Sequence, residues 1–531
     1  MRKLHNLLNT NFANTSVISY TLKVKRKDWI IAILIFTFAF LVRYLYITGY
    51  GKILFDYDQY EDLFLTKRIL IDRDLPVIGR PIYGDPRLHQ GVLFIYFNTV
   101  PFLLFNWNPV GVTLWIALFN AGVVLAVYYL SLLLFKNRIA AIISSLIVAA
   151  SFEFIQFATW ISNATLAIMT APLAFLGLYL YFKEKKMGLI VTALFLGLSL
   201  QSDVMFLYLI PIFVVIFIAL KMKFPDYKLL SASILTFLAT VSTMIITELK
   251  LSFAGVKTLL FFGNTFDDAK IPVIKRLTLF LTDLGKTFSY NLLPTNNTLG
   301  IYLALAITTF LLLKLFAAYK SRSAEKKPLI FLIVFLFSPL IMLVLGYHRQ
   351  PWFLIGILSA IAISAGYSIA KLKHPLLISI IVLFSIWSNL TYLFNPNKSA
   401  YNFFGYENSS FLANQIPVVD YMYQEAEGKP FAFNAVTYPM HHYALWAYHL
   451  GSYGEKKYDY LPTWLGATQD YPYNVIGQSD GSEKLYFLIM DKSVRIPEIN
   501  RTNALIWADA NSTLLEAKEF EGFTVQKRYK E

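Results

Sequence analysis

Cysteine is absent from the 531-residue chain, which excludes disulfide bonds, thiolate catalysis and cysteine-ligated metal centres. Charge is also scarce, because only 15% of the residues are Asp, Glu, Lys or Arg, whereas 56% are hydrophobic and 17% are aromatic. Such an apolar composition excludes an ordinary soluble protein of this length and predicts an integral membrane protein. The sequence contains no internal repeat with a clear period and no low-complexity tract.

Ionisable side chains are nearly absent from the interiors of the apolar stretches, since Arg43, Asp203, Glu248 and Lys314 lie near stretch ends. Ion-coupled transporters usually keep such groups near the middle of the membrane, so this scarcity argues against a pump. The net charge of +14 does not indicate a nucleic-acid partner. The basic residues instead cluster in short segments between apolar runs, which is the positive-inside pattern.

Eleven apolar stretches have lengths suited to helices that cross a bilayer, for which about 20 residues are needed. Two of the eleven are short and need flanking residues to span the membrane. We therefore predict an α-helical polytopic membrane protein with about eleven transmembrane helices. The stretches are 29–49, 110–134, 138–152, 164–182, 188–201, 203–220, 229–248, 299–318, 329–346, 352–370 and 375–394.

Basic residues set the predicted topology. They precede the first stretch and fill alternate short loops, whereas the opposite short loops, including 153–163, contain only Arg349. The N-terminus is therefore expected inside and the C-terminus outside the cytoplasmic membrane. No cleavage site follows the first stretch, so we expect it to remain as a membrane anchor.

This topology divides the chain into a cytoplasmic segment 1–28, a membrane domain 29–394 and an outer domain 395–531. The membrane domain carries two long outer segments, 50–109 and 249–298. Each contains apolar or amphipathic runs that we expect to lie at the outer membrane surface as interfacial or re-entrant helices. These runs are Val92–Trp107, Ser252–Phe262 and Ile271–Phe288.

The last 137 residues read as a small α/β domain. Asn414–Glu427 has the pattern of a helix, whereas Lys484–Met490 and Phe523–Lys527 have the pattern of strands. His441 and His442 do not predict a metal site, because adjacent residues rarely chelate one ion and no partner ligands are evident.

Acidic residues gather directly after the first stretch, within Phe55–Asp62. At this outer edge of a helical bundle a lipid-linked substrate can meet a polar one, and the Asp58 carboxylate can serve as a general base for an acceptor hydroxyl. Asp58 and Glu61 are also spaced as a helix capping box. Both interpretations stay open, and one residue can fulfil both.

Asp56 is the alternative base, because the spacing does not discriminate between Asp56 and Asp58. Glu61 and Asp62 lie three and four residues after Asp58, on the same face of a helix. They can position the acceptor or hold a divalent cation, the one cofactor that the sequence allows for without requiring it.

Arg349, between two predicted spans, can pair with a phosphate and stabilise the charge on a departing lipid phosphate. The alternative is an interfacial Arg that contacts lipid headgroups. His348, Lys270 and Arg276 are further candidates for phosphate binding, although charged interfacial segments also contact lipid nonspecifically.

Four stretches carry a resemblance to a known family. Within Phe55–Asp62, residues Asp58, Gln59 and Asp62 match a first-loop motif written D-Q-x-R-D, while Glu61 replaces the Arg. The second stretch is Leu75–Gly79 with His89–Tyr96, in which Gly91 matches the family. Arg80 and Val92 stand at positions where prolines are typical of the family. The other two stretches are Trp160–Asn163 and Phe520–Arg528.

In these stretches, and in layout over essentially the whole chain, the sequence resembles the membrane glycosyltransferases of the GT-C superfamily. It is most similar to the polyprenyl-phosphate-dependent group with the RgtA/B/C/D-like domain, relatives of the protein O-mannosyltransferases and of the lipid A aminoarabinose transferase. The resemblance implies that Asp58 is the catalytic base, with Asp56 as the fallback. It also implies a cavity lined by His89, Gln90, Trp160 and Asn163.

The resemblance implies an inverting enzyme that takes a sugar from a polyprenyl-phosphate carrier to a glycan, lipid or protein acceptor at the outer face of the membrane. Some members use a divalent metal and others do not. Two alternatives from other classes are a flippase or transporter for lipid-linked glycans and a non-catalytic membrane anchor that presents the outer domain as a binding module. Replacing Asp58 with Asn separates the enzyme from both.

Overall fold

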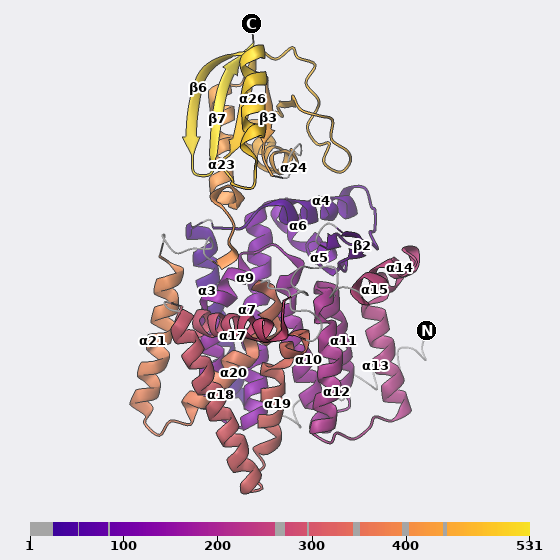
Figure 1. The fold of residues 1–531 in the computed structure, drawn as a ribbon, viewed down its shortest axis with the longest axis vertical. Coiled ribbons are helices and arrows are strands. Elements are labelled where there is room, and N and C mark those ends of the chain that lie inside the picture. Colours follow the sequence, from indigo (N-terminus) through magenta and orange to yellow (C-terminus); the bar gives the residue numbers. More distant parts are fainter. Residues whose placement is uncertain are drawn as a thin grey trace.

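The computed structural model describes residues 25–50, 52–82, 85–260, 271–294, 297–343, 351–395, 403–438 and 443–530. A bundle of helices forms most of the molecule, and a smaller domain with a β-sheet lies at one end of it (Figure 1). The predicted fold class, a helical membrane bundle with a small C-terminal α/β domain, is confirmed.

Helices occupy all eleven predicted stretches. Six described helices are long and apolar enough to cross a membrane, or up to eight if each of two bent pairs forms one span. The helices are α3 (Arg26–Tyr50), α7 (Pro109–Phe135), α8 (Arg138–Ala150) with α9 (Phe152–Ala158), η1 (Asn163–Leu166) with α10 (Ala167–Phe182), α11 (Met187–Ser202), η2 (Val204–Tyr208) with α12 (Leu209–Ala219), α13 (Tyr227–Thr240) with α14 (Ser242–Lys250), α18 (Asn297–Lys320), α19 (Lys326–Leu336) with η4 (Ser338–Leu343), η5 (Pro351–Ile357) with α20 (Leu358–Ala370), and α21 (Pro375–Leu393).

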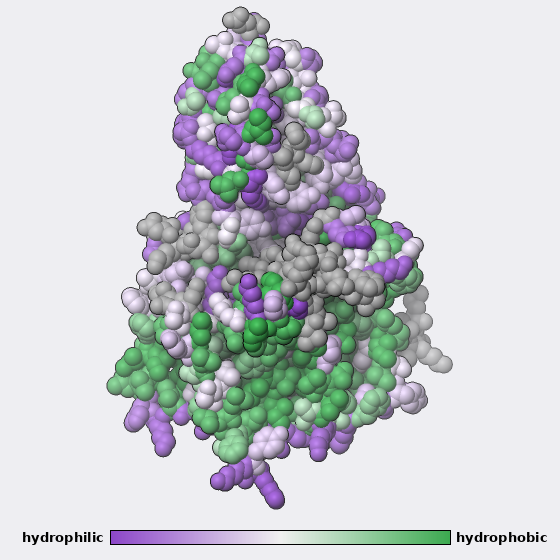
Figure 2. All heavy atoms as spheres, in the orientation of Figure 1, coloured by the Kyte–Doolittle hydropathy of each residue, from purple (hydrophilic) through white to green (hydrophobic). Residues whose placement is uncertain are grey.

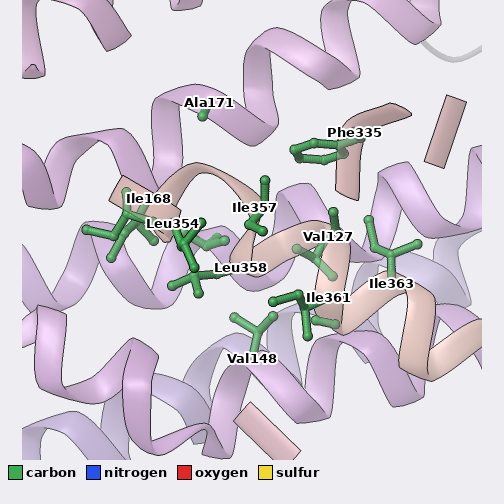
Figure 3. Packing of buried hydrophobic residues seen from close by; sticks show 14 of the residues in the cluster. Val127, Val148, Ile168, Ala171, Phe335, Leu354, Ile357, Leu358, Ile361 and Ile363 are labelled. Atoms are coloured by element: carbon green, nitrogen blue, oxygen red, sulfur yellow. The ribbon is translucent and has the colours of Figure 1, made fainter. Parts of the chain in front are cut away.

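On the face of the bundle that Figure 2 shows, hydrophobic side chains form a band. Hydrophilic side chains lie at the lower end of this band and over the domain above it, which is the distribution expected of a protein that spans a bilayer. Inside the bundle, apolar side chains of α7, α8, α10, α19 and α20 interdigitate (Figure 3). Val127, Val148, Ile168, Leu358 and Ile361 in this core are almost completely buried.

The segment 153–163, which we expected to be a loop, is helical over its first half. Ser151 has non-helical backbone angles, with φ −56° and ψ 128°, that end α8, and its hydroxyl accepts a hydrogen bond from Phe154 N at 3.2 Å. A capping serine therefore starts a second helix, α9, at an angle of 52° to α8. The connecting loop is confined to the few residues between Ala158 and Asn163.

Arg43 of α3 stabilises this break from the interior of the bundle. Its side chain is completely buried, and its guanidinium donates to the carbonyl oxygens of Ala149 at 3.0 Å and Val148 at 3.2 Å. It also donates to Asn120 Oδ1 at 2.7 Å and to Ala39 O at 2.9 Å. The carbonyl groups left without helical partners at the end of α8 are thus satisfied where water is excluded.

We expect Arg43→Met to lower the thermal stability of the purified protein, because the carbonyl groups at the α8–α9 break lose their donor. A buried acceptor left without a partner costs about 1–3 kcal/mol. Thermal unfolding in detergent measures the change, and Arg26→Met, at an exposed position of the same helix, is the matched control. Equal melting temperatures for the two variants would contradict this role of Arg43.

Short elements of segment 50–109 lie between the bundle and the C-terminal domain (Figure 1). They are α4 (Tyr57–Ile71), the antiparallel pair β1 (Pro81–Ile82) and β2 (Asp85–His89), α5 (Leu93–Phe97) and α6 (Thr99–Phe105). The run Val92–Trp107 thus forms two short helices instead of one span. The location of α5 and α6 at a membrane surface remains a prediction.

Segment 249–298 is helical in its described parts. Ala254–Leu260 forms α15 and Val273–Leu292 forms α17, which runs across the bundle helices (Figure 1). The C-terminal half of α17 is buried, with Phe280 and Phe288 completely inaccessible to solvent. One face of this amphipathic helix therefore packs against the bundle.

The C-terminal domain is built on a five-stranded sheet with the strand order β4-β3-β5-β7-β6. Strands β4, β3 and β5 run parallel, whereas β7 is antiparallel to β5 and β6 is antiparallel to β7. Helix α23 (Leu412–Ala426) packs on one face and α26 (Glu498–Asn511) on the other, so alternate residues of β5 are buried on both sides. The strands are β3 (Phe431–Val436), β4 (Thr463–Trp464), β5 (Leu485–Asp491), β6 (Thr513–Phe520) and β7 (Phe523–Tyr529), and the remaining helical segments are η7 (Asn408–Ser410), α24 (Ala444–His449), η8 (Leu450–Gly454) and α25 (Glu455–Tyr458).

Candidate functional site

The start of α4 is held between the bundle and the C-terminal domain. Leu54 forms a parallel bridge with Trp160 on one side and an antiparallel bridge with Phe411 on the other. Phe55 N donates to Ser410 O at 2.8 Å, in the short η7 turn of the C-terminal domain. The acidic residues that follow Phe55 are therefore placed by contacts with two distant parts of the sequence.

Asp56 is the N-cap of α4. Its Oδ1 accepts a hydrogen bond from Tyr57 N at 2.8 Å, and its own backbone N–H donates to Gln59 Oε1 at 2.9 Å, which completes a capping box. The expected box between Asp58 and Glu61 is therefore wrong by two residues. The reason is that the extended backbone ends at Asp56, so that Asp58 already lies in the first turn of the helix.

The second oxygen of Asp56 faces the C-terminal domain. Asp56 Oδ2 accepts from Ser410 Oγ at 2.7 Å and lies 3.1 Å from Arg495 Nη2. Both oxygens of this buried carboxylate thus have partners, one in α4 and one in the neighbouring domain. This arrangement favours a structural role for Asp56 over its alternative role as a base.

Three further carboxylates of α4 surround the guanidinium of Arg80. Asp58 Oδ1 is bonded to Arg80 Nη1, Asp62 Oδ1 lies 3.0 Å from Arg80 Nε, and Glu61 Oε2 lies 3.7 Å from Arg80 Nη1. Residues three and four positions apart on a helix point the same way, which is why one cation can reach all three acids. The Arg80 side chain is only 5% exposed.

Arg80 was not predicted as part of this cluster, because in the sequence it stands out only as an Arg in place of a typical proline. The missing Arg of the D-Q-x-R-D motif was the available signal. With Glu61 in its place, the acidic helix needs a cation from elsewhere, and the same segment contains few arginines. Arg80 reaches the cluster because its carbonyl accepts from Gln90 N at 2.9 Å, which holds this part of the segment against the residues after β2.

The three carboxylates differ in their access to solvent. The side chain of Asp58 is 43% exposed, that of Glu61 14% and that of Asp62 4%. Burial raises the pKa of Asp62 to about 7 against the opposing attraction of Arg80, and burial also raises the pKa of Glu61. The pKa of Arg80 is raised because attraction by the three acids outweighs its own burial.

The raised pKa of Asp62 predicts a pH dependence of stability. Its folded-state value of about 7 exceeds the ordinary value of 3.8, so the folded chain binds more protons than the unfolded chain between about pH 4 and 7. The proton on Asp62 therefore makes its whole contribution to the free energy of unfolding below about pH 4, and this contribution is lost as the pH rises to about 7. Asp62→Asn removes the titrating group, so the melting temperature of this variant relative to wild type should rise from pH 5 to pH 8.

Asp85→Asn is the matched control in the same segment. Arg87 lowers the pKa of Asp85 to about 2, so Asp85 does not titrate between pH 5 and pH 8. The melting temperatures of wild type, Asp62→Asn and Asp85→Asn at pH 5 and pH 8 test this prediction. A difference between Asp62→Asn and wild type that stays constant with pH would show that Asp62 is not protonated in the folded protein.

Among the described residues, no group of three or more His, Asp or Glu side chains is arranged to hold a metal ion. Glu61 and Asp62, the expected cation ligands, face the guanidinium of Arg80 instead. A metal ion bound by this pair would have to displace Arg80. The carboxylates at the start of α4 therefore fit a guanidinium better than a divalent ion.

The four residues expected to line a cavity lie in two places. Trp160 is 2% exposed and packs against Trp352 and Phe404 with ring centroids 5.4 Å and 5.3 Å away. Asn163 is also buried and bonds to the Ser202 carbonyl. Trp160 and Asn163 therefore belong to the packed interior beneath α4 and do not face open solvent.

His89 and Gln90 are half-buried at the end of β2. The residue after them, Gly91, packs so tightly on α11 that a Cβ there would lie 2.1 Å from Gln201 Oε1. This contact fixes His89 and Gln90 beside the bundle, and it explains physically why glycine occupies position 91.

Of the four basic residues expected to bind phosphate, only Arg276 lies in the described part of the chain. Its guanidinium donates to Ile271 O at 2.8 Å and to Leu343 O at 3.0 Å, so it joins α17 to η4. Lys270, His348 and Arg349 lie outside the described residues, as do His441 and His442. Leu343 immediately precedes the segment that contains His348 and Arg349.

A cleft of about 530 Å³ opens where the C-terminal domain meets the linker that leads into it. Its lining includes Ser409 and Val494, the sequence neighbours of the two residues that contact Asp56. The volume is in the range of small-molecule sites, about 300–1,000 Å³.

No protein-family model and no curated protein sequence matches the chain. Several solved structures share its architecture, among them two of the same protein. ArnT from Cupriavidus metallidurans bound to undecaprenyl phosphate matches with a TM-score of 0.56 and 11% sequence identity, over 95% of this chain and 98% of that chain. The chain has the GT-C fold. The apo state of the same ArnT matches with a TM-score of 0.53 and 11% identity, over 94% and 98% of the two chains.

The similarity to ArnT extends through the bundle and into the C-terminal domain, because it covers nearly the full length of both chains. At this level of identity the likeness concerns the fold. The predicted resemblance to GT-C proteins is thereby confirmed at the level of the fold.

Proposed function

We propose that the protein is a membrane glycosyltransferase that moves one sugar from a polyprenyl-phosphate carrier to an acceptor hydroxyl, with inversion, at the outer face of the cytoplasmic membrane. The GT-C fold supports a transferase of this class. The ArnT structure contains undecaprenyl phosphate, which supports a lipid-phosphate donor. The band of apolar helices supports a site at the membrane surface. The basic residues in alternate short loops support an N-terminus inside and a C-terminus outside.

The carboxylate of Asp58 is the single observation that carries this proposal. Arg80 binds one of its oxygens, and the other accepts no hydrogen bond from any residue that the structure describes. The side chain is 43% exposed at the end of the bundle. A fixed carboxylate with one free oxygen beside solvent is suited to accept a proton from a bound hydroxyl.

The neighbouring acids are less suited to this role. Asp56 uses both oxygens to cap α4 and to bind the C-terminal domain. Asp62 is only 4% exposed and lies against Arg80. We therefore assign general-base catalysis to Asp58, and we assign to Glu61, Asp62 and Arg80 the positioning of this carboxylate and of the acceptor.

The proposed reaction is a single displacement. The acceptor oxygen attacks the anomeric carbon while the bond from this carbon to the phosphate oxygen breaks, and the bonding electrons leave with the phosphate. Asp58 takes the proton of the acceptor hydroxyl. Because phosphate is a good leaving group, no separate acid is required, and basic side chains suffice to stabilise its charge. Arg349, His348, Lys270 and Arg276 stay our proposed phosphate ligands.

Asp58→Asn should lower sugar transfer at least about 100-fold, because the carboxamide cannot accept the proton. Binding of the carrier lipid should be retained. Asp74→Asn is a matched control, since Asp74 lies in the same segment, is bonded to Arg68 and has a side chain that is 44% exposed. Transfer of radiolabelled sugar by purified protein in lipid measures the rates.

Two results would argue against the proposal. Transfer at the parental rate by Asp58→Asn would exclude Asp58 as the base. Movement of lipid-linked glycan across vesicle membranes by both wild type and Asp58→Asn, without any transfer, would instead identify a transporter. A membrane-anchored binding module would show neither activity.

We further propose that Arg80 supplies the positive charge that a divalent ion supplies in a metal site. Its guanidinium already contacts Glu61 and Asp62, the expected cation ligands. Transfer should therefore persist within about twofold when divalent ions are removed with EDTA, and the measurement is the initial rate before and after chelation. A loss of transfer that Mg²⁺ or Mn²⁺ restores would contradict this role of Arg80.

A further inference from the structure

We propose that Arg495 of the C-terminal domain is a positioning residue for Asp58, acting across the domain boundary through Asp56. This inference rests on the proposed function, because it assumes that Asp58 is the base. It assigns the C-terminal domain a part in holding the catalytic helix.

The contact between Arg495 and Asp56 is well defined. Arg495 Nη2 lies 3.1 Å from Asp56 Oδ2 and 3.2 Å from Ser410 Oγ, and Ser410 Oγ itself donates to the same carboxylate oxygen at 2.7 Å. The guanidinium lies over the ring of Tyr438, 4.7 Å from its centroid, and its Nε donates to Ser493 Oγ at 3.2 Å. Arg495 is thus held in place independently of Asp56.

Arg495 projects from the loop between β5 and α26, and this loop packs on the η7 turn that contains Ser410. Val494 N donates to both carboxylate oxygens of Glu407, at 3.1 Å and 3.2 Å. Gly522, with a φ of +93°, approaches so closely that a Cβ there would lie 2.6 Å from Ser409 N. The loop, the turn and the β6–β7 connection therefore form one rigid clamp for the Asp56 carboxylate.

The effect of this clamp reaches Asp58 through the first turn of α4. Asp56 is the N-cap and Asp58 is the second residue of the helix, so a rotation of the cap moves Asp58 with it. On the other side of the same turn Gln59 Nε2 donates to Ile161 O at 3.1 Å. Two anchors, one in each domain, therefore fix the direction in which Asp58 points, and Arg495 supplies the only cation in the described contacts of Asp56.

Loss of Arg495 should impair turnover more than substrate binding. Without it, the Asp56 carboxylate stays buried beside a hydroxyl and without a cation, which favours movement of the cap toward solvent. A displacement of about 1 Å of a reacting group can cost on the order of 100-fold in rate. We expect Arg495→Gln to lower kcat about 10- to 100-fold and to change KM for the lipid-linked donor less than about twofold. Arg495→Lys, which keeps the charge, should recover part of the loss.

Lys456→Gln is the matched control for domain docking. Lys456 Nζ donates to Asn106 O at 2.5 Å, which is another contact between the C-terminal domain and segment 50–109, away from Asp56. This variant should keep the parental kcat. The double variant Asp56→Asn with Arg495→Gln should lose no more activity than the stronger single variant, because both changes remove the same interaction.

Hydrogen exchange of the backbone amides of residues 57–60, in the full-length protein, tests the contact without the reaction. Arg495→Gln should accelerate exchange in this turn at least about tenfold, and Lys456→Gln should leave it unchanged. Unchanged exchange and kcat in Arg495→Gln, or equal losses in the two variants, would overturn the inference. If wild-type protein transfers no sugar, the proposed function fails, while the exchange rates still decide whether Arg495 holds the start of α4.

Discussion

The guanidinium of Arg80 lies among the carboxylates of Asp58, Glu61 and Asp62 in a position that is almost closed to water. An acidic helix face at the end of an apolar bundle is unfavourable unless a cation compensates it, because like charges repel strongly where water is scarce. One cation for three acids leaves an excess of negative charge. Burial raises the pKa of Asp62, and the negative charges of Asp58 and Glu61 raise it further against the attraction of Arg80. Asp58, at the open edge, keeps access to solvent.

Two sets of contacts fix the orientation of the start of α4, which carries these acids. The segment before α4 pairs with the bundle through Trp160 and with the C-terminal domain through Phe411. The carboxylate of Asp56 also contacts two parts of the structure. One oxygen accepts a hydrogen bond from the backbone of α4, and the other contacts Ser410 and Arg495 of the C-terminal domain. The site is thus assembled at the boundary between a membrane bundle and an α/β domain, and neither part contains it alone.

The sequence predicted the helices well, because hydrophobic length in a membrane protein reports directly on the span. It missed the break at Ser151, since serine is compatible with a helix and the break depends on donors from Arg43, which lies more than a hundred positions earlier. It also placed the capping box two residues late, because Asp56-Gln59 and Asp58-Glu61 both fit the pattern.

The acids of the candidate site were predicted from their position after the first span, whereas their cations were not. Arg80 lies 22 residues from Asp58 and Arg495 lies 439 residues from Asp56, and no local periodicity connects residues so far apart. Only the pairing of β1 with β2 and the docking of the C-terminal domain bring them near. The acidic residues in the sequence indicate that compensating cations exist, but they do not identify which Lys or Arg residues these are.

The long sequence separation of the contacts around Asp56 has a consequence for biosynthesis. Ser410 follows Asp56 by 354 residues, so the second carboxylate oxygen of Asp56 gains its partners only after the residues of the C-terminal domain have been made. A nascent chain therefore forms its hydrophobic helices before the start of α4 is held from both sides.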